Sequence, residues 1–434
     1  MARHGCVSHR ADQPQVRMNG RKIPPVWILA LPWLTFGMVS GFVLVTLPNV
    51  LGAQGIPGAR LGVAVAVIGS PMFWNFIFAP LLDVRFNRRT YALVFGILGV
   101  AATAFTVLHM HQLVVVEIVM LIGFLSVCMY QSAVGGWVGS LIGENQDSKL
   151  GAWSTVYNLS GGGIGTMVSG YAIEHWNITT AAALCFAVFL APLLAFIWIP
   201  SVQVGTVRMG ENFSRFVREI GALVRRPQVL MALAMFILPS ASFALTNVLS
   251  GWSGDFRASE QFVSLIGGGG IIAGGIIGSL LVPILARRIP LRALYLSIGL
   301  VGASFTLCML LLPRTEAVFG LVFLGENTMQ SAAIAAAAAI TFEVIGTGNP
   351  LAATTYALLI AAGNLPIDYM AAVDARGYAW HGISGALLTD ALLSAGACLL
   401  LVLLFRRRLL AQPQRGAAQV GNLSRGTSST CSSV

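Results

Sequence analysis

The chain has 434 residues, of which 56% are hydrophobic and only 10% are charged, and its mean hydropathy is +0.80. Soluble globular proteins carry about 25% charged residues, so the composition excludes them and predicts an all-α polytopic membrane protein. The net charge of +10 does not indicate a nucleic-acid partner. The basic residues lie between apolar runs, where they report membrane topology and contact with anionic lipid.

Twelve apolar runs are long enough to cross a lipid bilayer, since a membrane-spanning helix needs about 20 mostly apolar residues. The expected spans are Val26–Pro48, Leu61–Leu82, Tyr91–Leu108, Leu113–Ile142, Leu150–Ile173, Thr179–Ile199, Val229–Ser250, Phe262–Leu285, Leu291–Leu312, Ala317–Phe342, Leu351–Val373 and Ile383–Phe405.

The placement of Lys and Arg predicts that both termini are cytoplasmic. Of the 26 Lys and Arg residues, only Arg60, Arg257, Arg314 and Arg376 fall in connections that this orientation places outside. Basic residues accumulate on the cytoplasmic side of inner-membrane proteins, so a multi-pass protein of the inner (plasma) membrane is expected. The predicted parts are a tail (1–25), a six-helix bundle (26–200), a linker (201–227), a second six-helix bundle (228–406) and a disordered tail (407–434).

The linker between the two bundles carries apolar and basic residues at helical spacing. Phe213, Phe216, Val217 and Ile220 alternate with Arg215 and Arg218. This pattern predicts an amphipathic helix on the inner membrane surface, with a solvated linker as the alternative.

The connection between the second and third spans concentrates ions in a few residues. Asp83, Arg85, Arg88 and Arg89 lie there and are expected to act as a gating loop. Part of this region recurs 203 positions later, which indicates duplication of a six-helix unit. The pairs are Pro80 and Pro283, Leu82 and Leu285, Arg85 and Arg288, Arg89 and Arg292, Gly96 and Gly299, and Gly99 and Gly302. Asp83 corresponds to Ala286, so the two units differ at the carboxylate.

Two spans carry small residues at every fourth position, a spacing that allows helix backbones to approach closely in lipid. The ridges are Gly161 and Gly165 in the fifth span, and Gly270, Gly274 and Gly278 in the eighth. Transporters with twelve spans pair these two helices across their halves, so the ridges are expected to face each other there.

Carboxyl groups within apolar spans are functional candidates, because each costs about 2.5–3.5 kcal/mol at the bilayer centre on insertion scales. Glu326, Asp368 and Asp390 are the predicted proton-coupling residues, with Glu326 first because it lies mid-span. Polar side chains that could line a central cavity with them are Asn75, Tyr130, Gln131, Tyr157, Asn158, Asn247, Asn327, Gln330 and Asn364. Trp33, near a span end, fits an interfacial anchor.

The sequence predicts neither an enzyme nor a cofactor. Zinc-protease, nucleophile-elbow and P-loop motifs are absent from it. The histidines outside the N-terminal tail, at positions 109, 111, 175 and 381, come from different loops or helix ends without compact ligand spacing. No metal site is therefore predicted.

Several short stretches resemble the major facilitator superfamily and, within it, the AmpG-type permeases, which are relatives of the acetyl-CoA transporters. The stretch Ala79-Pro80-Leu81-Leu82-Asp83 matches the family's lead into the second connection. Gln131 and Trp137 match its fourth helix, the stretch from Tyr171 to Trp176 follows its Gly-rich fifth helix, and Glu326-Asn327 matches the opening of its tenth. The resemblance implies the twelve-helix facilitator fold.

The chain also departs from these families. The loop motif lacks its first Gly, has Val84 after the Asp and places Arg88-Arg89 one residue late. In the fourth helix the AmpG-type acids are missing, because the chain reads Gln-Ser-Ala-Val-Gly-Gly-Trp from Gln131 to Trp137. If those acids handle the substrate or protons in the family, this chain performs that task differently.

The expected function is therefore secondary transport by alternating access. The predicted cargo is an organic solute such as a siderophore (or other metallophore) or an anhydro-muropeptide, imported with protons by a monomer. An efflux permease of the same superfamily and a membrane protein without transport activity are the alternatives.

Overall fold

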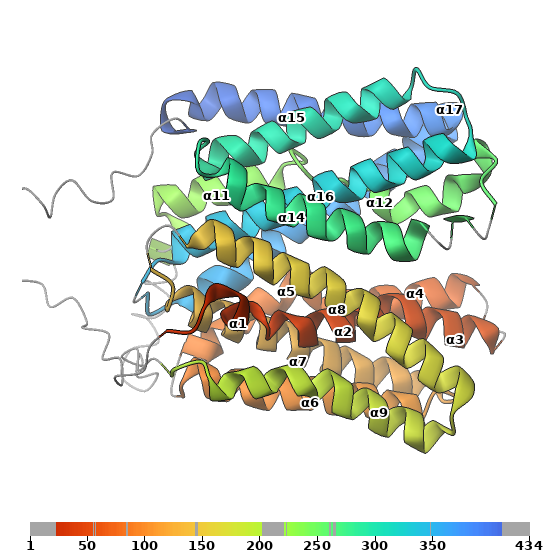
Figure 1. Cartoon of the computed structure of the whole chain (residues 1–434), viewed down its shortest axis with the longest axis vertical. Coiled ribbons are helices and arrows are strands. Elements are labelled where there is room, and N and C mark those ends of the chain that lie inside the picture. Colours follow the sequence, from red (N-terminus) through yellow and green to blue (C-terminus); the bar gives the residue numbers. More distant parts are fainter. Residues whose placement is uncertain are drawn as a thin grey trace, which may run out of the picture.

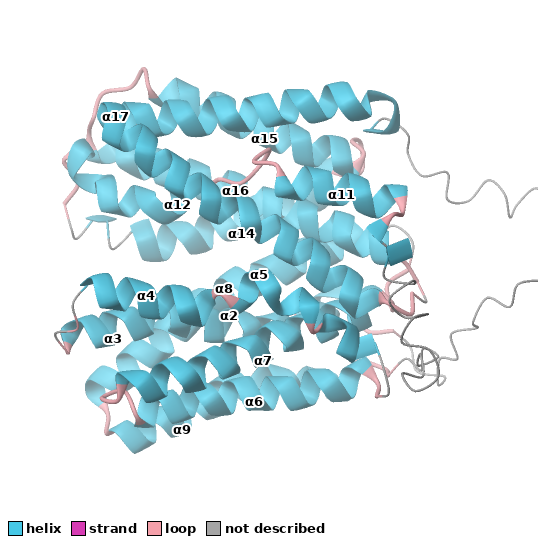
Figure 2. Ribbon diagram, turned by 180° about the vertical axis from the view of Figure 1, so that it is seen from behind, coloured by secondary structure: helices cyan, strands magenta, loops and turns pink. Residues whose placement is uncertain are grey.

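The computed structural model describes residues 23–409, except for positions 55, 57, 84–85, 144–145, 202–220, 223, 260–261, 264–265 and 348. The described residues form helices joined by loops, without a strand (Figure 2). Arg85 and the linker segment from Phe213 to Ile220 lie outside the described residues. Most of each tail and the side chain of Asn247 also lie outside them.

The first half of the chain forms nine α-helices and four short turns of other pitch, marked η. These are α1 Val26–Ala30, α2 Trp33–Gly41, η1 Phe42–Thr46, α3 Leu47–Ala53, α4 Gly58–Gly69, α5 Pro71–Trp74, η2 Asn75–Ile77, η3 Ala79–Asp83, α6 Arg88–Leu108, α7 Leu113–Gly139, α8 Asp147–His175, α9 Ile178–Leu190 and η4 Ala191–Ile197. The second half consists of α11 Pro227–Ile237, α12 Leu245–Val248, η5 Leu249–Phe256, η6 Ile266–Gly270, α14 Ile271–Leu285, α15 Leu291–Met309, α16 Glu316–Ile345 and α17 Ala352–Leu409.

Seven of the described helical segments have the length and apolar composition needed to cross a membrane. They are Val26–Leu51, Arg88–Leu108, Leu113–Gly139, Ile178–Ile197, Leu291–Met309, Glu316–Ile345 and Ala352–Arg406. Three shorter apolar helices accompany them, and α17 bends back at His381 and Gly382, where Gly382 has a φ of 60°. The count of twelve spans stays a prediction.

The helix α8 has 29 residues but is less apolar than the seven segments. Several of its small and polar residues, among them Gly161, Gly165 and Ser169, are buried against other helices, and α8 packs against α2, α14 and α16. This is the physical reason why length marks α8 as a span while hydropathy does not.

The two halves of the chain lie side by side (Figure 1). Helices α1 to α9 gather in one bundle and most of α11 to α17 in the other, and contacts between the bundles involve α8 with α14 and α16, and α7 with α17. The helix α1 begins and α17 ends at the same end of the molecule, which we call the terminal end.

The glycine ridges pack inside each half and not against each other, contrary to expectation. A methyl group on Gly165 would lie 2.2 Å from the carbonyl oxygen of Met38 on α2, and one on Gly278 would lie 2.0 Å from the carbonyl oxygen of Thr328 on α16. Small residues thus bring α8 onto α2 and α14 onto α16. The spacing identified close contacts correctly, but it carries no information about the partner helix.

The helices α8 and α14 do meet across the halves, through other residues. Ile272 approaches Gly163, and Leu159 approaches Gly275. Backbones also approach each other closely across the halves where Gly136 faces Ala353 and where Gly151 faces Ala335. The Gly-Gly pair that stands in the fourth helix beside the missing family acids therefore makes room for α17.

Gly278→Val is expected to prevent α14 from packing on α16 and to lower the melting temperature and yield of the purified protein strongly. Overpacking at a helix contact costs about 1–3 kcal/mol, and more where only backbone can move. The matched control is Gly396→Val, because Gly396 is exposed and has open space around it. Equal melting temperatures for the two variants would contradict the assigned contact.

Candidate functional site

The carboxylate of Asp83 joins the two halves at the terminal end. Asp83 ends η3 in the first half, and its side chain is buried. Its Oδ1 accepts a hydrogen bond from the backbone N–H of Ala353 (3.2 Å), and its Oδ2 accepts from the backbone N–H (2.9 Å) and the hydroxyl (2.7 Å) of Thr354. Asp83 therefore caps the N-terminus of α17 from the opposite bundle.

Arg88 completes this contact from the first turn of α6. Its Nε donates to Asp83 Oδ1 at 2.8 Å. Its Nη2 donates to the carbonyl oxygens of Asn349 (3.0 Å) and Pro350 (2.7 Å), in the connection that precedes α17. We call Asp83, Arg88 and the segment from Asn349 to Thr354 the latch.

The latch is favourable because each charge in it meets a complementary group. Free N–H groups at a helix N-terminus attract an anion, and the buried guanidinium is satisfied by a carboxylate and two carbonyl oxygens. Removing one partner of a buried ion pair typically costs about 3–5 kcal/mol, because it leaves the other charge unpaired.

Among the described residues of the region, the neighbouring Arg89 does not join the latch. Arg89 is half-buried and makes no ion pair within the described residues. In the second half, Arg292, the counterpart of Arg89, donates from Nη2 to Glu343 Oε1 at 2.9 Å within its own bundle. With Ala286 in place of Asp83, the duplicated loop offers no carboxylate at the corresponding position, so the latch is asymmetric.

Three aromatic side chains lie next to the latch and link the halves. Trp33 Nε1 donates to the hydroxyl of Tyr356 at 3.0 Å, and the rings of Trp33 and Phe342 meet edge to face at 6.0 Å. Trp33 is 2% exposed, so the expectation of an interfacial anchor was wrong. Its position near a span end suggested lipid, but the ring turns inward to the other half.

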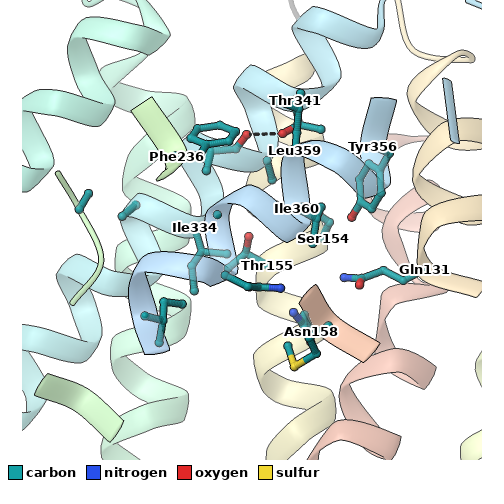
Figure 3. A pocket seen from close by; sticks show the side chains of 18 of the residues that line it. Gln131, Ser154, Thr155, Asn158, Phe236, Ile334, Thr341, Tyr356, Leu359 and Ile360 are labelled. Atoms are coloured by element: carbon teal, nitrogen blue, oxygen red, sulfur yellow. Dashed lines mark hydrogen bonds between the residues drawn. The ribbon is translucent and has the colours of Figure 1, made fainter. Parts of the chain in front are cut away.

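A cavity of about 230 Å³ lies between the two bundles, and Trp33 and Tyr356 form part of its wall. The first half contributes α2, α5, α7 and α8 to its wall, and the second half contributes α11, α15, α16, α17 and the segment after α11. The side chains of Gln131, Thr155 and Asn158 converge on one region of it (Figure 3). None of the described residues that line the cavity carries a formal charge.

Of the nine side chains that the sequence suggested for a cavity, Gln131, Asn158 and Asn364 line this one. The others that can be described bond elsewhere or pack away from it. Tyr130 donates to Pro32 O (2.7 Å), Asn75 to Pro71 O (2.9 Å), Asn327 to Phe323 O (2.8 Å) and Gln330 to Thr246 Oγ1 (2.7 Å), while Tyr157 packs on Trp153. Sequence reasoning missed Trp33, Ser242, Tyr295 and Tyr356, of which only the tyrosines had a signal, as aromatics within spans.

Three carboxyl groups are buried in the second half, outside the cavity. Glu326 on α16 and Asp390 on α17 are 0% and 3% exposed, and Asp374 on α17 is 0% exposed. Asp374 interacts electrostatically with the other two, and Glu326 with Asp390. Thr306 donates to Glu326 Oε1, whereas Glu326 Oε2, Asp390 Oδ1 and both oxygens of Asp374 have no hydrogen-bond partner in the described structure. We call these three residues the carboxyl cluster.

The third predicted coupling residue, Asp368, is exposed and is not part of the cluster. Asp374 was missed because the sequence suggested that the eleventh span ends at Val373. The helix instead continues to the bend at His381, so Asp374 is buried inside it.

A cavity between two helical bundles, closed at one end by an ionic contact between them, defines a two-bundle membrane transporter. The sequence matches the model of the Major Facilitator Superfamily over residues 29–367. The chain belongs to this family of transporters, whose members are generally not enzymes. No curated protein matches its sequence.

Solved structures share the fold at low sequence identity. The human organic anion transporter MFSD10 (TETRAN) aligns with a TM-score of 0.65 and 19% identity over 87% of this chain and 100% of its own. FucP, a transporter of the same superfamily solved in the outward conformation, gives 0.65 and 15% over 90% and 99%. A bacterial homologue of the iron transporter ferroportin, in an outward-facing state, gives 0.64 and 14% over 88% and 99%.

Proposed function

We propose that this chain is a secondary active transporter that imports a small organic solute together with protons across the inner membrane. It works by alternating access, as a monomer. The observation that carries the proposal is a solute-sized cavity between the bundles whose terminal end is closed by the latch. Opening the latch while the other end closes would move a bound solute through the protein.

The basic residues support a cytoplasmic position for the terminal end. Arg287 and Arg288 lie in the connection between α14 and α15 at this end, and Arg88, Arg89 and Arg292 lie in the first turns of α6 and α15 there. Such residues concentrate on the cytoplasmic side. The conformation described above is then the outward-facing one, with its cytoplasmic end closed.

The carboxyl cluster supports coupling to protons. Three carboxylates in an apolar environment repel one another, and ionised groups without a counter-charge are costly inside a membrane. Within the described residues, no Lys or Arg pairs with Glu326, Asp374 or Asp390. Protons can neutralise the cluster, and their release on the cytoplasmic side would make uptake depend on the proton gradient.

The resemblance to AmpG-type permeases suggested a siderophore or an anhydro-muropeptide as the solute. A cavity without charged residues fits an anhydro-muropeptide poorly, because its carboxylates would find no cation there. The uncharged wall therefore favours neither solute, and the solute class is derived from the cavity itself below. Efflux of a drug or metabolite remains the competing direction.

Proton movement driven by solute distinguishes these alternatives. The full-length protein is reconstituted in proteoliposomes that contain a pH-sensitive dye, and pooled candidate solutes, including siderophores, an anhydro-muropeptide and neutral sugars, are added outside. Symport predicts that an active pool acidifies the lumen. Alkalinisation of the lumen would indicate proton antiport and hence efflux, and solute entry without any proton movement would contradict coupling.

A further inference from the structure

We infer that the central cavity accepts a small uncharged solute with an apolar face and one hydrogen-bonding edge. This inference rests on the proposed function and names the chemical class that the site selects. It follows from the charge, the free polar groups, the apolar wall and the size of the cavity.

The wall of the cavity excludes charged solutes. It consists of aliphatic, aromatic, hydroxyl and amide side chains, and the described lining includes no Asp, Glu, Lys, Arg or His. An ion moved from water into such an environment loses hydration that an uncharged wall does not replace, at a cost of several kcal/mol. A solute whose charge must enter this cavity would therefore bind weakly.

The polar groups of the wall are available to a ligand. Ser242 is 3% exposed, and its hydroxyl has no hydrogen-bond partner in the described structure although it lies at the cavity. Gln131, Asn158 and Asn364 make no hydrogen bond to other described residues. By contrast, the hydroxyls of Ser154 and Thr155 are already used by the carbonyl of Gly151.

The amide and hydroxyl groups of the cavity wall favour a solute that can both donate and accept hydrogen bonds. Each amide offers two donors and a carbonyl acceptor, and a hydroxyl both donates and accepts. Hydroxyl or amide groups on the solute satisfy both functions without a charge. An unsatisfied buried polar group costs about 1–3 kcal/mol. A bound solute of this kind gives the hydroxyl of Ser242 a hydrogen-bond partner, and its own polar groups find partners in the wall.

Much of the rest of the wall is apolar. Phe36, Phe236, Tyr295, Ile334 and Leu359 contribute ring faces and aliphatic surface. Such walls, with a few polar groups that fix orientation, are typical of small-molecule sites. A ring or compact hydrocarbon face of the solute fits against them.

The size of the cavity limits the solute. Its volume of about 230 Å³ is below the 300–1,000 Å³ of drug-sized pockets. A single substituted ring therefore matches this volume better than an intact siderophore or disaccharide-peptide. The carboxyl cluster lies outside the cavity, so the coupling proton does not need a counter-charge on the solute.

Charge selectivity of the cavity is measurable without knowing the solute. Asn364→Cys is introduced into the full-length protein with Cys6, Cys308 and Cys431 replaced by Ser, since the remaining cysteines are buried. Thiosulfonate reagents of similar size that are neutral, anionic or cationic are applied to membranes from the side opposite the latch. Rates are normalised to Leu311→Cys, a loop position that is 86% exposed.

The neutral reagent is expected to react at Asn364→Cys at least about tenfold faster than either ion after normalisation, which corresponds to about 1.4 kcal/mol. Adding Gln131→Glu should then accelerate the cationic reagent selectively, which shows that the rates report the charge of the cavity. An anionic or cationic reagent that reacts as fast as the neutral one overturns the inference, and so does the absence of reaction with all three. Transport and gating are measured by other variants, so that result would leave the proposed function standing.

Discussion

Asp83→Asn is expected to shift the transporter from a closed terminal end toward an open one by roughly two to four orders of magnitude in the equilibrium constant. The substitution preserves the shape of the side chain but removes the charge that faces Arg88 and the N-terminus of α17. The unpaired Arg88 then lies at the contact between the halves, and breaking such a buried pair costs about 3–5 kcal/mol, or roughly 10²–10⁴ in an equilibrium constant.

Labelling from the cytoplasmic side measures this shift. Ser154 lines the cavity on α8 and is 3% exposed, so Ser154→Cys should be protected from an impermeant maleimide in inside-out vesicles. Asp83→Asn should make it reactive. Arg89→Gln is the matched control, because it removes a neighbouring charge that lies outside the latch, and it should leave protection intact. Equal labelling of the two variants would contradict the role of the latch.

Glu326→Gln is expected to abolish uphill uptake while solute exchange continues. Gln imitates the protonated carboxyl, so it can accept the bond from Thr306 but cannot release a proton. Exchange requires no net proton movement and should survive. The measurement is proton-driven accumulation against equilibrium exchange in the same proteoliposomes, with the active solute pool as probe.

Asp374→Asn and Asp368→Asn test whether the loss of accumulation is specific to the carboxyl cluster. Asp374 belongs to the cluster, so Asp374→Asn should reduce accumulation as Glu326→Gln does. Asp368 is exposed and outside the cluster, so Asp368→Asn should not. A Glu326→Gln protein that still concentrates solute and still loses it on addition of an uncoupler would show that the cluster is not the coupling site.

Much of this architecture follows from the sequence because lipid imposes simple rules. The apolar runs, the clustering of basic residues between them and the isolated carboxyls of Glu326 and Asp390 are local features. They predicted a helical transporter, and the family match confirms its class. The importance of Asp83 and Arg88 could also be anticipated, since ions between two spans are otherwise unexplained.

Partners distant in the chain could not be predicted. In the latch, Arg88 donates to backbone oxygens of residues 349 and 350, and Asp83 accepts from backbone N–H groups of residues 353 and 354. Such backbone partners cannot be recognised from residue types. The ridge of Gly161 and Gly165 indicated a close helix contact but did not identify α2 as the partner helix. Tyr130 was expected to line the cavity, but its hydroxyl donates a hydrogen bond to the carbonyl oxygen of Pro32. Polar residues in membrane helices often satisfy backbone carbonyls in this way.

The departure from the AmpG-type pattern in the fourth helix has a structural meaning. Where those proteins carry acids, Gly135 and Gly136 allow Tyr356 and Ala353 of α17 to approach α7 directly. Acidic side chains there would separate the bundles or require a buried partner. The carboxyl cluster of Glu326, Asp374 and Asp390 lies in the second half instead.

Simultaneous distance measurements at both ends of the molecule test alternating access most directly. Spin labels at Lys149 and Arg288 report the terminal end, and labels at His111 and Leu311 report the opposite end; all four positions are exposed and each pair joins the two halves. In Asp83→Asn, the first distance should lengthen and the second should shorten relative to the unchanged protein. Lengthening of the first distance without shortening of the second, or no change in either, would contradict transport by alternating access through the latch.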